Sequence, residues 1–269
     1  MSNIMVFIPA YRCEKQIGRV LAQFTPAIAQ RFAEIVVVEN RSPDGTLEAA
    51  RLGLAAIEGC PVTLLQNDEN YSLGGSHKVA FNYCLAKGYD YLVVLHGDDQ
   101  GRISDILPYL EDGNFERYDC LLGARFMPGS QLNGYSILRI IGNYVFNAVA
   151  TCLTGRLIYD LGSGLNLYKA TALAGNYYLN FPNFLLFNEY MLLYFTDQKK
   201  SLKFFPISWR EEDQASNAKL FSIARSLFSI FFNYAFRRRR LLHTSHCPEN
   251  NWPYHVAFSN TNRPEGANK

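Results

Sequence analysis

Short, continuous apolar runs alternate with segments of helical spacing over the first third of the chain. The runs that predict strands cover residues 4–8, 34–38, 62–65 and 91–95. The segments between them, which place apolar residues three and four positions apart, cover residues 17–32, 46–57 and 75–87. Strands separated by single helices imply right-handed β-α-β units. The pattern therefore predicts a Rossmann-like α/β fold, with a mostly parallel sheet and helices on both of its faces.

The apolar pattern continues less regularly in the second half of the chain. Further helices are expected over residues 135–154, 184–195 and 220–236, and a late strand over residues 203–207. The last helix is unusual, because Ser222, Ser226, Ser229 and Asn233 would form a thin polar stripe along an otherwise apolar cylinder. Four arginines, residues 237–240, follow it directly.

The chain divides into three expected parts. Residues 1–219 form one large domain, since 269 residues with 48% hydrophobic content fit a single core better than two. Residues 220–243 form an amphipathic helix that lies on a membrane surface or in an oligomer contact. Residues 244–269, which are rich in Asn, Pro and Gly, form a flexible tail.

Composition narrows the class of protein. The net charge of +2 is too small to indicate a nucleic-acid partner. The six cysteines are scattered without a C-x-x-C pair, which argues against a disulfide framework or a zinc site and favours a reducing compartment. Residues 1–11 lack the basic start of a signal peptide. No stretch reaches the ~20 uninterrupted apolar residues of a spanning helix, so we expect a cytoplasmic protein that is at most peripheral to a membrane.

Polar residues follow the predicted strand 91–95 directly, in the sequence HGDDQG. Ligands of open parallel sheets bind at the carboxyl ends of the strands. Two adjacent acids there, Asp98 and Asp99, are placed to hold a hard divalent cation, which would screen a diphosphate leaving group. The alternative is a solvated acidic turn, since Asp and Gly favour turns.

Two further strand ends carry candidate chemistry. Glu39 and Asn40 follow the second strand and could accept hydrogen bonds from a base or ribose, or simply form a turn. Gly74 and Gly75 open the third helix, where backbone N–H groups and Lys78 could face a phosphate. An ordinary glycine-rich start of a helix is the alternative.

Together these segments resemble glycosyltransferase family 2, which has the GT-A fold, and within it the polyprenyl-phosphate sugar synthases such as dolichol-phosphate mannose synthase. The resemblance extends from about residue 4 to about residue 219. The segments that carry it, in family order, are IPAY at 8–11, IGRVL at 17–21, VVVENRSPDGT at 36–46, NYSLGGSHK at 70–78, HGDDQ at 96–100, GARF at 123–126, DLGSGLNLYK at 160–169 and the late WREED and SNAK.

The resemblance implies a nucleotide-sugar donor and a divalent cation, Mg²⁺ or Mn²⁺. The donor would be bound by Pro9, Ala10, Tyr11, Glu39, Lys78, Asp98, Asp99 and Lys219. The cation would be held by Asp98 and Gln100, and Arg210 with Lys219 would belong to a loop that closes over the diphosphate. His96 departs from the family, because it stands where the first acid of the metal motif is expected.

The resemblance also implies acceptor residues. Arg125, Arg139 and Ser163 would lie near an acceptor phosphate, and the catalytic set would comprise Asp98, Arg125, Glu189 and Arg210. A lipid phosphate needs arginines to position it but no general base, whereas a sugar hydroxyl needs a carboxylate such as Glu189. Glu189 could equally be a structural acid on its helix.

The apolar helix 220–236 with its arginines, and Arg139, favour the lipid phosphate. We therefore expect an inverting transferase that moves a sugar to a polyprenyl phosphate (undecaprenyl or dolichyl) for cell-surface glycan assembly, on the cytoplasmic face of a membrane. Transfer to a glycan hydroxyl with Glu189 as base is one alternative. A nucleotide-sugar-binding protein without catalysis, prompted by His96, is another. The late helix could also be a core or homo-oligomer contact.

Overall fold

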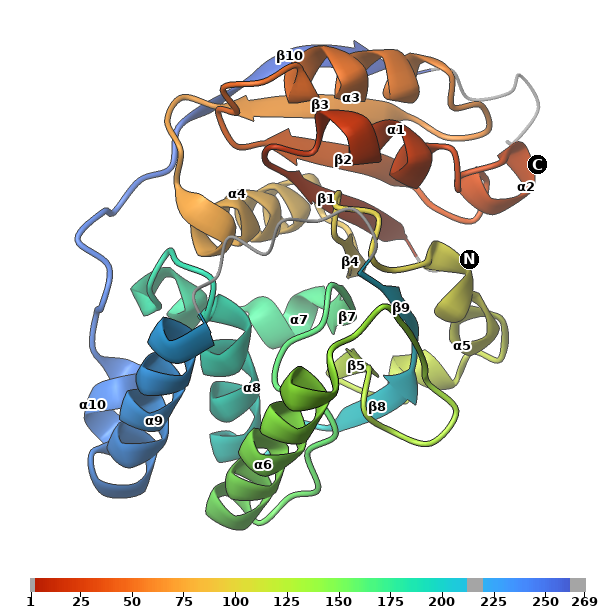
Figure 1. Ribbon diagram of the computed structural model, residues 1–269. Helices are drawn as coiled ribbons and strands as arrows, with labels where there is room; N and C mark the ends of the chain where they lie inside the picture. Colours follow the sequence, from red (N-terminus) through yellow and green to blue (C-terminus); the bar gives the residue numbers. More distant parts are fainter. Residues whose placement is uncertain (1–2, 212–219, 262–269) are drawn as a thin grey trace.

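The computed structural model describes residues 3–211 and 220–261 (Figure 1). Its centre is a mixed sheet of eight strands in the order β10-β3-β2-β1-β4-β7-β5-β8. The strands are β1 (Ile4–Ala10), β2 (Glu34–Glu39), β3 (Val62–Asn67), β4 (Tyr91–Leu95), β5 (Cys120–Ala124), β7 (Leu165–Lys169), β8 (Leu202–Pro206) and β10 (Tyr254–Asn260). Strands β3, β2, β1 and β4 are mutually parallel, as are β5 and β8, whereas β7 and β10 are antiparallel to their neighbours. The α/β fold is confirmed, and the expected parallel arrangement holds for the first half.

Helices cover both faces of the parallel half, which explains its continuous apolar runs. Along β1, Met5 and Phe7 pack on one face and Val6 and Ile8 on the other, because successive side chains of a strand point in opposite directions. The helices of this half are α1 (Glu14–Leu21), α2 (Pro26–Ala29), α3 (Thr46–Ala55) and α4 (Ser72–Lys87). Figure 1 shows α1 and α3 on one face and α4 on the other.

The expected single helix over residues 17–32 is wrong. Helix α1 ends at Leu21 and α2 starts at Pro26. Proline lacks the N–H that a helix interior requires but is well accommodated in the first turn of a new helix. Pro26 therefore separates two short helices.

The helices of the second half gather at one end of the molecule (Figure 1). They are α6 (Ile137–Thr154), α8 (Phe187–Asp197), α9 (Leu220–Phe236) and α10 (Arg238–His243). Helices α6 and α9 contact each other through the rings of Phe146 and Phe228, whose centroids are 5.3 Å apart. The remaining elements are α5 (Leu107–Glu111), α7 (Ala170–Leu173), the paired strands β6 (Gln131–Asn133) and β9 (Ser208–Arg210), and the 3-10 turns Ile103–Asp105, Asn114–Arg117 and Tyr177–Asn180.

The expectation of a flexible tail is wrong for residues 244–261. Strand β10 pairs antiparallel with β3, and Trp252 just before it is buried. An edge strand such as β3 offers a row of unpaired backbone groups, and pairing with it overrides the weak local preference of a segment rich in Asn and Pro. Residues 262–269 lie outside the described part of the chain.

Candidate functional site

Two cavities meet at the carboxyl end of the parallel strands. The first cavity has a volume of about 690 Å³ and is lined by residues that follow β1, β2 and β4. Those on which the site depends are Pro9, Ala10, Tyr11, Asn40 and Asp98. The second cavity, of about 490 Å³, lies beside α6, α8 and α9. His96 lines both cavities, so a ligand in one can reach a ligand in the other.

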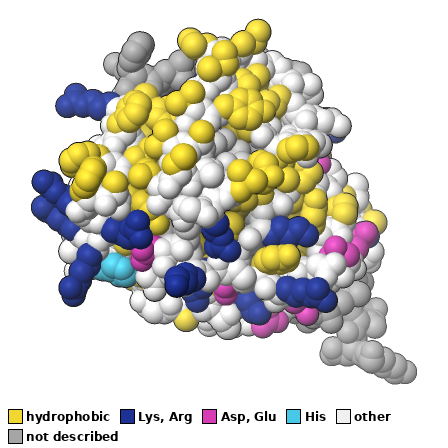
Figure 2. Space-filling view, turned by 90° about the horizontal axis from the view of Figure 1, so that it is seen from below, with side chains coloured by type: hydrophobic (Ala, Val, Ile, Leu, Met, Phe, Trp, Pro, Cys, Tyr) yellow, Lys and Arg dark blue, Asp and Glu magenta, His cyan; other side chains and the backbone are white. Residues whose placement is uncertain are grey.

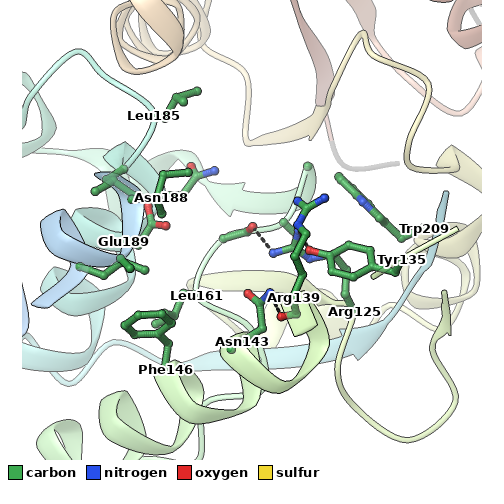
Figure 3. Close-up of a pocket in the computed structure, with 18 of the residues that line it drawn as sticks. Arg125, Tyr135, Arg139, Asn143, Phe146, Leu161, Leu185, Asn188, Glu189 and Trp209 are labelled. Carbon is green, nitrogen blue, oxygen red and sulfur yellow. Dashed lines mark hydrogen bonds between the residues drawn. The ribbon is translucent and has the colours of Figure 1, made fainter. Parts of the chain in front are cut away.

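Figure 3 shows the second cavity, in which the sequence-predicted acceptor residues come together. Arg139 of α6 lies on one side of it, near Arg125, and Glu189 of α8 lies on the other. Ser163 also lines this cavity. The rest of the lining is largely apolar and includes Leu138, Phe146, Leu161, Leu185, Leu186, Ile223 and Leu227. Four candidate charged and polar groups thus line a largely apolar space.

Arg125 is fixed by a bidentate ion pair. Its Nε and Nη2 each donate to the Asp160 carboxylate at 2.8 Å, and Nη2 also donates to the carbonyl of Gly162 at 2.8 Å. The ring of Trp209 covers the guanidinium, with the two centres 5.1 Å apart. Burial alone would lower the pKa of Arg125, but the Asp160 carboxylate raises that pKa above its usual range. Arg125 therefore presents a permanent, rigidly oriented cation.

Arg139 and Ser163 have different surroundings. Arg139 forms an ion pair with Glu211, and its guanidinium lies over the ring of Tyr135 at 4.7 Å. The hydroxyl of Ser163 donates to the carbonyl of Leu165 at 3.2 Å and is buried. Arg139, whose side chain is 25% exposed, can thus reorient toward a ligand more readily than Ser163 can.

Among residues 3–211 and 220–261, no counter-ion bonds to Glu189, and its buried Oε2 has no hydrogen-bond partner. Burial raises the pKa of Glu189 to about 8, and the nearby positive charge of Arg125 offsets only part of this effect. Glu189 is therefore mainly a neutral carboxyl at neutral pH.

Asp98 and His96 occupy the place expected for a metal motif. Burial raises the pKa of Asp98 to about 6 and lowers that of His96 to about 4, so His96 is neutral at pH 7. Within residues 3–211 and 220–261, no group of three His, Cys, Asp or Glu side chains is arranged to hold a metal ion.

Gln100 does not join Asp98 in the first cavity. It lines a third cavity instead, of about 370 Å³, with Arg19, Arg102 and Arg210. The backbone N–H of Gln100 donates to Oδ1 of Asp98 at 3.3 Å, and the shared role of the two residues in holding a cation stays a prediction. The residues fit a cation that takes one carboxylate from the protein and its other ligands from a diphosphate and water, which is the usual manner of Mg²⁺.

Lys78 does not face either cavity. Its Nζ donates to the carbonyl of Leu179 at 3.1 Å and to Oδ1 of Asn183 at 2.8 Å, and it lies 4.5 Å from the ring centre of Trp252. It also donates to the carbonyl of Phe181. The expected donor contact is corrected: Lys78 holds a loop and the C-terminal segment together.

Glu39 is also committed elsewhere. It is fully buried, and its carboxylate accepts hydrogen bonds from the backbone of Arg41 and Ser42 and from Gln66 at 2.6–3.2 Å. The expected contact with a donor base or ribose is corrected, because the carboxylate fixes the turn after β2. The neighbouring Asn40 lines the first cavity instead.

Asp99 and Arg210 bind each other, and their expected contact with a donor stays a prediction. The Asp99 carboxylate accepts from Arg19 Nε at 2.5 Å and forms an ion pair with Arg210. Both residues line the third cavity, away from the first. Lys219, which is expected to contact the donor, lies outside the described residues.

Three residues at or behind the second cavity have no role in the sequence-based prediction. Trp209 and Asn188 line the cavity, and Asp160 fixes Arg125 from behind it. Asp160 and Trp209 belong to the segments DLGSG and WREED, which carried the resemblance. Their position in these segments was therefore a signal in the sequence that they lie near the site. Asn188 has no such signal.

Comparison with known proteins places the chain in a family. Residues 5–174 match the sequence profile described as glycosyl transferase family 2. The chain belongs to this family, which confirms the glycosyltransferase class predicted from its motifs.

Curated relatives make the comparison more specific. The chain is 25% identical over 171 residues to undecaprenyl-phosphate mannosyltransferase of Micrococcus luteus, covering 64% of this chain and 68% of the relative. It is 26% identical over 169 residues to polyprenol monophosphomannose synthase of Mycolicibacterium smegmatis, covering 63% and 62%. An uncharacterized protein of Methanocaldococcus jannaschii is 28% identical over 170 residues, covering 63% and 66%. The chain thus spans about two thirds of the length of these relatives.

Solved structures confirm the GT-A fold. Glucosyl-3-phosphoglycerate synthase from Mycobacterium tuberculosis, in complex with UDP, superposes with a TM-score of 0.59 at 14% identity, covering 87% of this chain and 80% of the other. Mannosyl-3-phosphoglycerate synthase from Rubrobacter xylanophilus gives a TM-score of 0.55 at 15% identity, covering 89% and 74%. At these identities the likeness defines the fold alone.

Proposed function

We propose that the protein is an inverting glycosyltransferase that moves a sugar from a nucleoside-diphosphate donor in the first cavity to a polyprenyl phosphate in the second. The observation that carries this proposal is the second cavity, where arginines and apolar side chains line one space. An acceptor with a phosphate and a hydrocarbon chain satisfies both kinds of lining. The names of the two bacterial relatives support the same acceptor class.

The reaction requires little acid–base chemistry from the protein. An oxygen of the acceptor phosphate attacks the anomeric carbon, the bond from that carbon to the diphosphate breaks, and the nucleoside diphosphate leaves. A phosphate monoester is ionised near neutral pH, since its second pKa is about 6, so no general base is needed. The protein must hold the nucleophile in line with the bond that breaks. Arg125 is already oriented for this role, and Arg139 lines the same cavity.

A divalent cation, Mg²⁺ or Mn²⁺, fits the first cavity through Asp98. Bound there with the diphosphate, such a cation would neutralise negative charge that develops on the leaving group. A related structure of glucosyl-3-phosphoglycerate synthase contains Mn²⁺ with UDP-glucose. Replacement of Asp98 by Asn is expected to lower the transfer rate by about 100-fold or more, whereas Asp68→Asn, at a half-exposed carboxylate, serves as the control.

We also propose that the protein rests on the cytoplasmic face of a membrane. The apolar face of the molecule consists of exposed side chains on α6 and α9, namely Ile137, Leu138, Ile141, Tyr144, Val145, Phe228, Phe232 and Phe236. Figure 2 shows hydrophobic side chains gathered at this end, with Lys and Arg side chains along their border. Such a border suits anionic headgroups.

We propose that helix α6, in addition to α9, lies at the membrane surface. It is the one helix among the described residues that is long and apolar enough to cross a bilayer, with a mean hydropathy of 1.3 over 18 residues. Because α6 packs on α9 and lines the second cavity, we assign it to the membrane surface. The second cavity then lies beside the apolar face, where a lipid acceptor would be found.

A panel of donors and acceptors tests the proposed function. Transfer from a set of nucleoside-diphosphate sugars is measured with undecaprenyl phosphate and, in parallel, with soluble sugars that offer only hydroxyl groups. Transfer to the lipid phosphate alone is the expected result. Transfer to hydroxyl acceptors alone would establish the alternative in which Glu189, which lines the same cavity, acts as base. Donor binding without any turnover would indicate a binding protein.

A further inference from the structure

Glu189 is a buried acid that the proposed reaction does not use. It lies in the first turn of α8 and lines the second cavity, across from Arg139 (Figure 3). It is also close to Gly162, where an added Cβ would come within 3.6 Å of its Oε1. The carbonyl of Gly162 is one of the groups that orient Arg125. Glu189 thus borders the place where an acceptor phosphate is expected.

The surroundings of Glu189 favour the neutral carboxyl over the carboxylate. Within the described part of the chain its buried Oε2 has no hydrogen-bond partner, and the lining of the cavity includes the apolar side chains of Phe146 and Leu161. Arg125, whose charge acts on Glu189, shares a bidentate ion pair with Asp160, and the Asp160 carboxylate opposes its effect on Glu189. A buried carboxylate without a counter-ion is costly, so the group retains a proton instead.

A neutral carboxyl has one hydrogen-bond donor, the O–H group. The acceptor phosphate in the same cavity offers only oxygen acceptors. On the basis of the proposed polyprenyl-phosphate acceptor, we infer that the protonated carboxyl of Glu189 donates a hydrogen bond to a non-bridging oxygen of the acceptor's phosphate. This assigns Glu189 to acceptor binding and removes it from the role of general base.

Several charged and titratable groups bear on the protonation of Glu189. Arg125 favours the carboxylate, and Asp160 disfavours it. Burial raises the pKa of Tyr190 to about 12 and lowers that of His96 to about 4, so neither titrates near pH 8. Arg139 lies across the cavity from Glu189 and is paired with Glu211. A bound phosphate dianion would favour the neutral carboxyl further.

The kinetic test compares three proteins over pH 6–9, with undecaprenyl phosphate as acceptor: wild type, Glu189→Gln and Glu189→Met. An amide keeps a hydrogen-bond donor at every pH, whereas a thioether has none. In the wild type, the KM for the acceptor should rise as the pH increases through about 8, since the donor is then lost and a repelling charge appears. Glu189→Gln should keep a KM within about threefold at pH 7 and lose this rise, while Glu189→Met should raise the KM about tenfold or more.

A binding measurement gives a second readout, independent of turnover. Titration calorimetry with farnesyl phosphate at pH 8, in buffers of different ionisation enthalpy, reports the protons taken up on binding. The wild type should take up about half a proton because its pKa is about 8, and Glu189→Gln should take up none.

Each contrary outcome has a distinct meaning. Loss of about 100-fold or more in kcat with Glu189→Gln, at every pH, would overturn the inference in favour of a general base. Wild-type kinetics in both variants would reduce Glu189 to a packing residue. If the wild type transfers sugar to the lipid phosphate, either of these results would overturn only the role inferred for Glu189 and would leave the proposed function intact. No transfer from any donor to lipid phosphate by the wild type would overturn the proposed function and this inference with it.

Discussion

Two charged side chains, Arg125 and Asp160, are buried together beside the second cavity. Their side chains are 13% and 1% exposed. The Asp160 carboxylate also accepts hydrogen bonds from the backbone N–H groups of Arg125 and Gly162. The pair therefore fixes both the guanidinium and the backbone that carries it, and removal of either partner leaves the other buried without compensation.

Replacement of Asp160 by Asn should lower the free energy of unfolding by about 3 kcal/mol, since the Arg125 charge then has no counter-ion. Urea denaturation followed by fluorescence measures this change. Glu48→Gln is the matched control, because it breaks the exposed ion pair with Arg51 and should change the free energy of unfolding much less. Equal losses in the two variants would show that burial adds nothing to the Arg125 pair.

Glu189 should make stability depend on pH. The folded chain holds the proton up to about pH 8, whereas the unfolded chain releases it near the ordinary pKa of 4.5. Unfolding between these values releases a proton, so the free energy of unfolding should fall as pH rises, by at most about 1.4 kcal/mol per pH unit.

Urea denaturation at a series of pH values from 5 to 8 measures this slope. The Glu189→Gln variant, which cannot titrate, provides the comparison and should show a shallower decline. Identical slopes in the two proteins would mean that Glu189 has an ordinary pKa.

At the residue scale, the sequence predicts where a side chain lies better than it predicts which group that side chain contacts. Pro9, Ala10 and Tyr11 line the first cavity, because the end of a parallel strand fixes their location, and their contact with a donor stays a prediction. Lys78 and Asp99 instead bind other parts of the chain. Their hydrogen-bond partners lie 80 or more residues away along the chain, and local sequence patterns carry no information about such contacts.

At the scale of the element, continuous apolar runs were the reliable signal. Strand β4 coincides with its prediction, and the expected helix over residues 220–236 coincides with α9. Strands β7 and β10 were missed. Residues 165–169 hold no continuous apolar run, because Asn166 interrupts it, and they follow a segment rich in turn residues. Strand β10 is stabilised chiefly by pairing with β3.

Lys78 ties three elements together, and its replacement should separate stability from donor binding. In Lys78→Met, the carbonyls of Leu179 and Phe181 lose their partner, so the melting temperature should fall by several degrees. The KM for the donor should stay within about twofold, because Lys78 lines neither cavity. Thermal unfolding and donor kinetics measure the two effects. A large rise in donor KM at unchanged stability would restore the donor-binding role.

At the scale of the whole molecule, the two cavities differ in their position relative to the apolar face. The first cavity is formed by strand ends in the half that binds the nucleotide in the proposed reaction, and the second lies among the helices that carry the apolar face. His96 lines both. The arrangement allows a water-soluble donor and a lipid acceptor to approach from different sides.

Charged residues on α6 should weaken membrane binding without unfolding the protein. Replacing Ile137, Leu138 and Ile141, which are 55–75% exposed, by Asp should lower co-sedimentation with vesicles of anionic phospholipid by about tenfold or more. Leu52→Asp is the control, since Leu52 is 56% exposed on α3, on the opposite part of the fold. Unchanged vesicle binding together with a lower oligomeric state would instead identify this face as a contact between copies of the chain.

The pairing of β10 with β3 has a consequence for how the protein is made. These strands contact each other across separations of nearly 190 residues, as in the interaction of His255 with Asp68. During synthesis, the edge of β3 therefore stays unpaired until residues 254–260 have left the ribosome, although the other strands of the parallel half are complete far earlier. An exposed edge of this kind invites pairing with other chains. The nascent chain thus passes through a period of aggregation risk that ends only when its last strand is in place.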